Sequence, residues 1–302
     1  MKFMKKLGNK EQGSLVQMLH ERIAGMRKAR SMKHIHASDL TYEQREFCPR
    51  EYALIDITHK KRMDEFISTS LQTTFDNGEE IQSRLNNDWL QDVMVGNWEC
   101  QSCGERMTMC KKPKLSCGKS GVRCRWKYEE PRVISKHSGI GCGLDALLDV
   151  GKTKLLIVEI KTMAQDSFKK LLSPLAEHRT RTRLYMRCAE ESDMATKLNT
   201  KTAKVLYVSR GYGTKAKPLP VAGRMDAPFS PFKEFDVVAD HDSVEDIVEA
   251  AREVTLFRKG EGPIPKGVCK NYACARAKQC PVVKECFSGK FKAGEMYNDG
   301  DT

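Results

Sequence analysis

The chain has 302 residues, of which 40% are hydrophobic and 30% charged, so it can bury a core as one large domain or as one domain with insertions. No apolar run approaches the ~20 residues that cross a bilayer, and the start MKFMKKLGNKEQGS lacks the apolar region of a signal peptide. We therefore expect a cytoplasmic protein with no membrane partner. The net charge of +12 favours an anionic partner such as a nucleic acid.

Residues 1–97 are expected to form an N-terminal helical region. The pattern predicts a basic amphipathic helix over 10–31 and then a helix that Ser38 and Asp39 cap and that runs through C-P-R-E-Y at 48–52. A further helix is expected over about 70–93, and it contains the stretch G-E-E-I-Q at 78–82.

Residues 98–131 look like an insertion, because the composition shifts to Cys, Lys, Gly and Ser with little apolar content. A Cys-x2-Cys-Gly knuckle with further cysteines nearby, in a segment too polar for a core of its own, is typical of a zinc ribbon folded by its metal. The predicted zinc ligands are Cys100, Cys103, Cys117 and Cys124, with Cys110 as the alternative for one place.

The remaining chain is expected to hold the core at 132–240 and a helix and cysteine-rich tail at 241–302. Strands are predicted at 132–138, 143–150, 154–161 and 203–209, and helices at 165–192 and 243–258. The Gly-, Pro- and Lys-rich residues 211–235 are predicted to be a loop or a mobile hairpin. This order indicates an α/β fold with a mixed central sheet flanked by helices.

An acid and a base end the apolar strand at 154–161. Glu159 and Lys161 are two residues apart and so face the same way, and Asp145 lies on the preceding strand of an expected hairpin. Most such Glu-x-Lys triplets are surface ion pairs worth ~0–1 kcal/mol. Here a glycine-rich approach at 139–143 leads into the aspartate, the layout of a metal-dependent nuclease.

Magnesium and manganese prefer oxygen ligands, and a bound cation offsets phosphate charge and lowers the pKa of an attacking water. Asp145, Glu159 and the carbonyl of Ile160 are the expected metal ligands. Lys161 would orient or help deprotonate the water, or stabilise the developing charge.

With Gly143-Leu144-Asp145 and Glu159-Ile160-Lys161-Thr162, the chain resembles the PD-(D/E)XK nuclease superfamily and, within it, the RecB-like branch. That branch has a Q-x-x-x-Y helix often preceded by histidine. The matching residues here are His178, Arg181 and Tyr185, which the resemblance implies bind DNA, with arginine in place of glutamine. The histidine of the branch's G-x-x-x-H motif is replaced by Gln82, so Gln82 and Glu79 or Glu80 are further candidate metal ligands.

Cysteines also flank the expected core at both ends. The resemblance extends to the iron–sulfur members of the branch, such as AddB and its CRISPR-associated relatives, in which one cysteine before the core and three after it hold a four-iron, four-sulfur cluster. The expected ligands are Cys48, Cys269, Cys274 and Cys280, with Cys286 as the alternative. A four-cysteine zinc site is the competing interpretation. Cys142 and Cys188 lie within apolar segments and are expected to be core thiols.

The resemblance implies a restriction-endonuclease-like core and a Mg²⁺- or Mn²⁺-dependent deoxyribonuclease, here expected to be an exonuclease. Such proteins act in DNA recombination, repair or phage DNA metabolism, so replication or recombination proteins are candidate partners and a phage-encoded member would work in the host cytoplasm. One alternative is a nucleic-acid-binding protein on a decayed nuclease fold. Another is a redox-sensing iron–sulfur regulator, which leaves the Glu-Ile-Lys strand unexplained.

Overall fold

The computed structural model describes residues 15–25, 34–42, 46–58, 68–114, 124–210 and 230–288. Its central sheet has the strand order β10-β9-β8-β7. β8 (Leu156–Ala164) is antiparallel to β7 (Ala146–Leu148) and parallel to β9 (Thr202–Arg210), and β10 (Phe232–Val238) is antiparallel to β9. The sheet is mixed, as the sequence predicts. β10 begins inside the segment expected to be a loop or a mobile hairpin, most of which lies outside the described residues, and it pairs antiparallel with β9.

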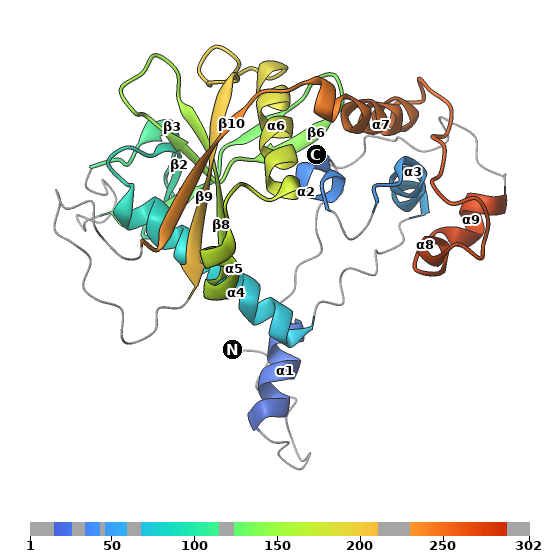
Figure 1. The fold of residues 1–302 in the computed structure, drawn as a ribbon, viewed down its shortest axis with the longest axis horizontal. Helices are drawn as coiled ribbons and strands as arrows, with labels where there is room; N and C mark the ends of the chain where they lie inside the picture. Colours follow the sequence, from blue (N-terminus) through green and yellow to red (C-terminus); the bar gives the residue numbers. More distant parts are fainter. Residues whose placement is uncertain are drawn as a thin grey trace.

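The helical segment expected at 165–192 is two helices, α5 (Gln165–Lys170) and α6 (Ala176–Glu190). Pro174 lies in the break, and a proline there would remove a helical hydrogen bond. α6 packs against strands of two sheets (Figure 1). Leu184 on α6 and Tyr207 on β9 are fully buried in the main core.

A second, three-stranded sheet carries the residues that lead to Asp145. It has the order β1-β6-β5, with β1 (Ile35–His36), β5 (Arg132–Ile134) and β6 (Ile140–Gly143). The strand expected at 143–150 is therefore interrupted, because β6 ends at Gly143 and β7 begins at Ala146 in the central sheet. Asp145 lies at this crossing from one sheet to the next.

A third sheet occupies the region expected to be a polar insertion. It consists of β2 (Val95–Cys100), β3 (Arg106–Lys111) and β4 (Trp126–Glu129), in the order β3-β2-β4. The segment was expected to be too polar for a core of its own, and its apolar residues share a core with the central sheet. Trp98, Trp126 and Tyr128 are buried in one apolar cluster with Val158 and Ile160 of β8. Polar residues separate these aromatics in the sequence, so the average composition of the segment does not reveal them. Because side chains alternate along a strand, they nevertheless lie on one face of the sheet.

The helix expected over 10–31 is described only at 15–25, which is helical, and the helix expected to start at Ser38 and Asp39 is divided into two. The described helices are α1 (Leu15–Gly25), α2 (Ala37–Leu40) and α3 (Pro49–Thr58), so Ser38 and Asp39 lie inside α2 and do not cap α3. Pro49 fits the first position of α3, where its missing N–H has no helical partner to lose. α4 (Thr69–Arg84) is capped by Ser68, which accepts a hydrogen bond from the Leu71 N–H, and continues as a π-helix over Leu85–Trp89.

The C-terminal helices are α7 (Asp242–Arg258), α8 (Ala275–Lys278) and α9 (Val283–Ser288). Among them, α7 packs against α3 and α6, and α9 packs against α3 (Figure 1). Leu54, Ile55 and Val282 form a small buried cluster that joins α3 to the tail. No helix among the described ranges is long and apolar enough to cross a membrane.

Candidate active site and cysteine centres

The register of β7 and β8 brings Asp145 and Glu159 together. Ala146 is paired with Val158 in an antiparallel ladder. Asp145, which precedes Ala146, therefore neighbours Glu159, which follows Val158. The Ile160 N–H donates to Asp145 Oδ2 over 2.8 Å, and Lys161 Nζ lies 3.4 Å from the same oxygen. Lys161 Nζ also lies 2.6 Å from Glu159 Oε1 and donates to the Ile160 carbonyl over 3.1 Å. The expected acid, acid and base therefore share one site.

Glu159 is fully buried, with 0% of its surface exposed, so the Glu159–Lys161 pair is not the surface ion pair that such triplets usually form. Arg181 Nη1 lies 3.5 Å from Glu159 Oε1 as a second cation. Glu159 Oε2 is buried and has no hydrogen-bond partner among the described residues. A buried carboxylate oxygen without a donor calls for an explanation, and an ion is one of the few that satisfy it.

The electrostatics of the site follow from the crowding of these charges. Burial and the negative charge of Glu159 raise the pKa of Asp145 to about 6. Burial alone would lower the pKa of Lys161, but the carboxylates of Asp145 and Glu159 outweigh it and raise that pKa to about 12. Two carboxylates are thus forced close together beside a permanently charged ammonium.

The residues expected to bind DNA lie on α6, next to this site. Arg181 is largely buried and is bound by Glu177 Oε1 at 2.5 Å and by Thr41 Oγ1 at 3.1 Å, in addition to Glu159. Tyr185 is 6% exposed and belongs to the main core. His178 Nδ1 lies 2.8 Å from the Tyr207 hydroxyl. Their contacts here are internal to the protein, and a role in DNA binding stays a prediction.

α4 closes the other side of the site. A Cβ added at Gly78 would lie 3.1 Å from Thr162 Oγ1, so glycine at this position lets the helix approach β8 closely. One turn later, Gln82 Nε2 donates to Glu130 Oε1 over 2.9 Å. Glu79 is exposed, and exposed Glu80 pairs with Arg84. Sequence reasoning missed Glu130, since a glutamate before a proline and a short strand carries no distinctive pattern.

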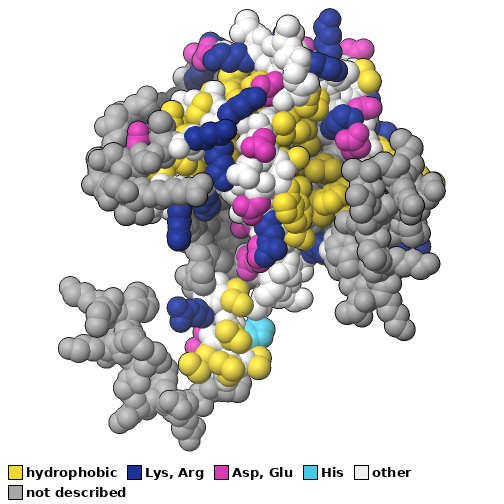
Figure 2. Space-filling view, turned by 90° about the vertical axis from the view of Figure 1, so that its left-hand side faces the viewer, with side chains coloured by type: hydrophobic (Ala, Val, Ile, Leu, Met, Phe, Trp, Pro, Cys, Tyr) yellow, Lys and Arg dark blue, Asp and Glu magenta, His cyan; other side chains and the backbone are white. Residues whose placement is uncertain are grey.

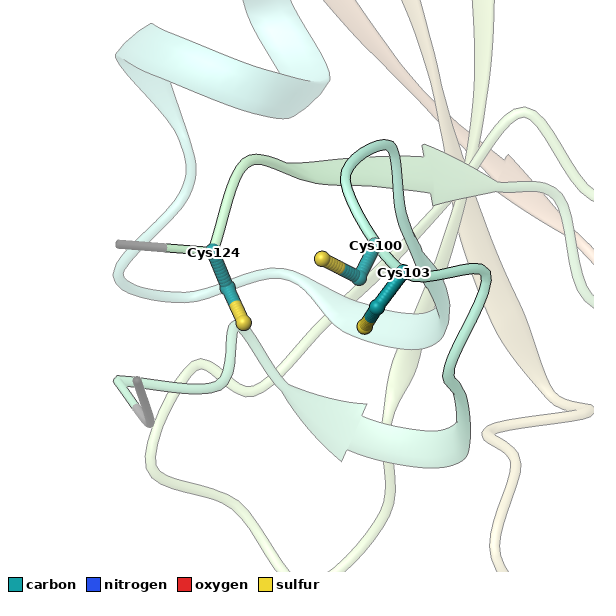
Figure 3. Close-up of side chains that lie close together, drawn as sticks. All are labelled: Cys100, Cys103 and Cys124. Carbon is teal, nitrogen blue, oxygen red and sulfur yellow. The ribbon is translucent and has the colours of Figure 1, made fainter. Parts of the chain in front are cut away.

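The third sheet brings three of the expected zinc ligands together. The sulfur atoms of Cys100, Cys103 and Cys124 all lie within 4.8 Å of one another and point toward a common centre (Figure 3). Burial opposes ionisation of Cys100, but the N–H groups of Ser102 and Cys103 and the two neighbouring thiols lower its pKa to about 6. Cys117 lies outside the described residues. Cys110 is half-buried, is not part of the group of three, and its carbonyl accepts a hydrogen bond from the Trp98 indole.

The tail cysteines gather around a pocket beside α3. Three of them, Cys269, Cys280 and Cys286, line it together with Cys48. Cys274 is the N-cap of α8, pairs with Cys269, and has its pKa lowered by the N–H groups of Ala277 and Arg276. Cys142 and Cys188 are buried in the main core in contact with each other, as expected of core thiols.

Comparison with protein-family models and with curated protein sequences finds no match. Among solved structures, the chain is similar to a protein titled SSO0001, at 14% identity and a TM-score of 0.41, covering 91% of this chain and 97% of that one. It is also similar to the alkaline exonuclease LHK-Exo from Laribacter hongkongensis, at 12% identity and a TM-score of 0.40, covering 78% and 90%. LHK-Exo in complex with dAMP matches at 12% identity and a TM-score of 0.39, covering 74% and 87%. Likenesses this distant leave the function to be argued from the residues of this chain.

Proposed function

We propose that the protein is a Mg²⁺- or Mn²⁺-dependent deoxyribonuclease of the PD-(D/E)XK type. One observation carries the proposal: the carboxylate of Glu159 is fully buried, keeps an oxygen with no donor among the described residues, and lies beside Asp145 and Lys161. A cluster of carboxylates kept for stability alone would be expected to pair every buried oxygen, because an unsatisfied one costs about 1–3 kcal/mol. A cation site needs such an oxygen free.

Asp145, Glu159 and the Ile160 carbonyl would hold the metal, and their all-oxygen character fits magnesium or manganese. When bound, such an ion offsets phosphate charge and activates a water. Lys161 keeps its ammonium between the two carboxylates, where it can stabilise negative charge on a phosphate oxygen. Arg181 fixes Glu159 from the other side, which holds the carboxylate in one orientation.

DNA is the proposed substrate, with exonuclease action and a place in recombination, repair or phage DNA metabolism. The net charge of +12 supports a polyanionic substrate. Lys and Arg side chains are spread over the face that includes the third sheet (Figure 2). The side chains of His178 and Arg181 are bound by the Tyr207 hydroxyl and by Glu177, respectively. They would therefore contact DNA only at the edge of the site.

Two metal centres accompany the nuclease site in this proposal. Zinc would bind Cys100, Cys103 and Cys124, because tetrahedral Zn–S bonds of ~2.3 Å place sulfur atoms about 3.8 Å apart, and these three sulfur atoms lie within 4.8 Å of one another. The fourth zinc ligand in this proposal is Cys117. The zinc would stabilise the third sheet.

A four-iron, four-sulfur cluster would occupy the pocket beside α3. Each of its four thiolates binds a different iron, so their sulfur atoms stand farther apart than those around a single zinc ion. No three of the tail cysteines, nor Cys48 with two of them, come as close together as the three zinc candidates. The pocket lining supports Cys48, Cys269, Cys280 and Cys286 as the ligands, in place of the sequence-predicted set that includes Cys274.

The proposed function is tested by digestion of end-labelled single-stranded and duplex DNA with Mn²⁺, with Mg²⁺ and with chelator. We expect metal-dependent cleavage that is lost in Asp145→Asn, Glu159→Gln and Lys161→Ala, while each variant still binds DNA. Glu249→Gln is the control, because that exposed carboxylate lies 3.3 Å from Arg252 on the same helix, α7. Full activity in purified Glu159→Gln would refute the proposal, and DNA binding without cleavage by the wild type would leave a non-catalytic binding protein.

A further inference from the structure

A third carboxylate stands at the edge of the proposed metal site, on the side of α4. Glu130 follows β4, and its Oε1 accepts a hydrogen bond from Gln82 Nε2 over 2.9 Å. Its Oε2 lies over Gly143, since a Cβ added there would be 2.9 Å away. Gly143 is two residues before Asp145, and the Leu144 N–H between them donates to the Pro131 carbonyl over 2.9 Å. The backbone therefore holds Glu130 beside the entry to Asp145.

Charge also links Glu130 to the site. The Glu130 carboxyl interacts electrostatically with Asp145 and with Lys161. Gln82 contributes one N–H to Glu130 Oε1, which fixes the carboxylate and leaves Oε2 turned toward Gly143. In the same site, Glu159 is 0% exposed with an oxygen that no described donor satisfies. Lys161 and Arg181 offset part of the repulsion among these three carboxylates, and a divalent cation would offset more of it.

We propose that Glu130 is a third carboxylate ligand of the divalent cation bound by Asp145 and Glu159, and that Gln82 is its positioning residue. The inference rests on the proposed function. A carboxylate contributes a full negative charge, whereas the Gln82 amide would offer only a neutral carbonyl, and the number of charged oxygen ligands sets the affinity for such ions. Gln82 acts through Glu130, as the outer hydrogen-bond partners of metal ligands commonly do.

The neighbouring residue offers a matched control. Glu129 ends β4, is paired with Asn97 of β2 across the third sheet, and its carboxylate lies 3.8 Å from the Arg106 guanidinium. Glu129→Gln and Glu130→Gln remove the same charge one residue apart. A general electrostatic effect would weaken cation binding similarly in both variants. Loss of a metal ligand would weaken it only in Glu130→Gln.

Mn²⁺ binding is measured on the intact purified protein by electron paramagnetic resonance of the free ion, without DNA. We expect Glu130→Gln to raise the Kd at least about tenfold and Glu129→Gln to leave it within twofold. Gln82→Ala is a change on the surface of α4, and its fold is checked by circular dichroism against the wild type. It should raise the Kd about tenfold, as the loss of an outer partner does. Equal Kd values in Glu130→Gln, Gln82→Ala and wild type would overturn the inference.

A second-site rescue provides a sharper readout. Position 82 lies within hydrogen-bond reach of the Glu130 carboxylate, so a histidine there could supply a ligand nitrogen to the same region. Gln82→His placed in the Glu130→Gln protein should recover much of the Mn²⁺ affinity, which a merely structural role of Glu130 would not allow. Asp145→Asn separates the two proposals. Mn²⁺ binding lost in Asp145→Asn but unchanged in Glu130→Gln overturns only the third ligand, and absence of Mn²⁺ binding by the wild type overturns the metal site itself.

Discussion

The pair formed by Glu51 and Arg276 should contribute strongly to the stability of the C-terminal region. Arg276 Nη2 donates to Glu51 Oε2 over 2.7 Å, and the side chains are 15% and 1% exposed. Glu51→Gln keeps the shape but leaves the arginine charge without its partner. Removing one member of a buried pair costs about 3–5 kcal/mol, and the partial exposure of Arg276 places the expected loss near ~3 kcal/mol.

The assay is urea unfolding of Glu51→Gln, Arg276→Met and the double variant, with hydrogen exchange at α3 and α8 to detect local opening and iron content measured in parallel. The double variant should be less destabilised than the sum of the single changes, with a coupling energy of roughly 1–3 kcal/mol. Glu80→Gln breaks the exposed pair with Arg84 and should cost less than about 0.5 kcal/mol. Losses below ~1 kcal/mol for both single variants, or strict additivity, would show that the pair does not hold the tail.

Two further predictions concern a buried histidine and the cysteine centres. Burial, with the charges of Lys161 and Arg181, lowers the pKa of His178 to about 3, so below about pH 6.5 the unfolded chain takes up a proton that the folded one refuses. Stability should therefore fall with acid by up to ~1.4 kcal/mol per pH unit, and His178→Gln should flatten that slope relative to wild type; parallel slopes would contradict the reasoning. Anaerobically purified protein supplied with iron should contain about four irons and one zinc. Cys48→Ala and Cys286→Ala should lose the brown colour of the iron–sulfur cluster, whereas Cys274→Ala should keep it. Cys100→Ala should lose only zinc. Two zinc ions and no iron per chain would refute the cluster.

Local pattern was enough to find the strand that carries the proposed catalytic residues. The apolar run that ends in Glu159 and Lys161 is β8, and the hairpin with Asp145 follows from two strands joined by a short turn. The same patterns failed where a single proline decides the outcome, since Pro49 and Pro174 set helix boundaries inside segments expected to be continuous. For 211–235 the sequence left a loop and a hairpin open, because the pairing of β10 with β9 is a long-range contact that periodicity does not contain.

The missing histidine at position 82 shows why the rest of the site needed the fold. From the sequence alone, glutamine at position 82 means a weaker metal ligand, because an amide is a poorer ligand than an imidazole. In the structure, Gln82 donates a hydrogen bond to Glu130, which lies 48 residues away in the sequence and belongs to no motif. The third sheet carries Glu130 to that place, and its aromatic core packs on Val158 and Ile160, which flank Glu159 on β8. The cysteine-rich region and the acidic site are therefore in mechanical contact. A change that loosens the third sheet moves both β8, which holds Glu159, and Glu130, which contacts Gln82. Neither motif can therefore be interpreted as an independent module.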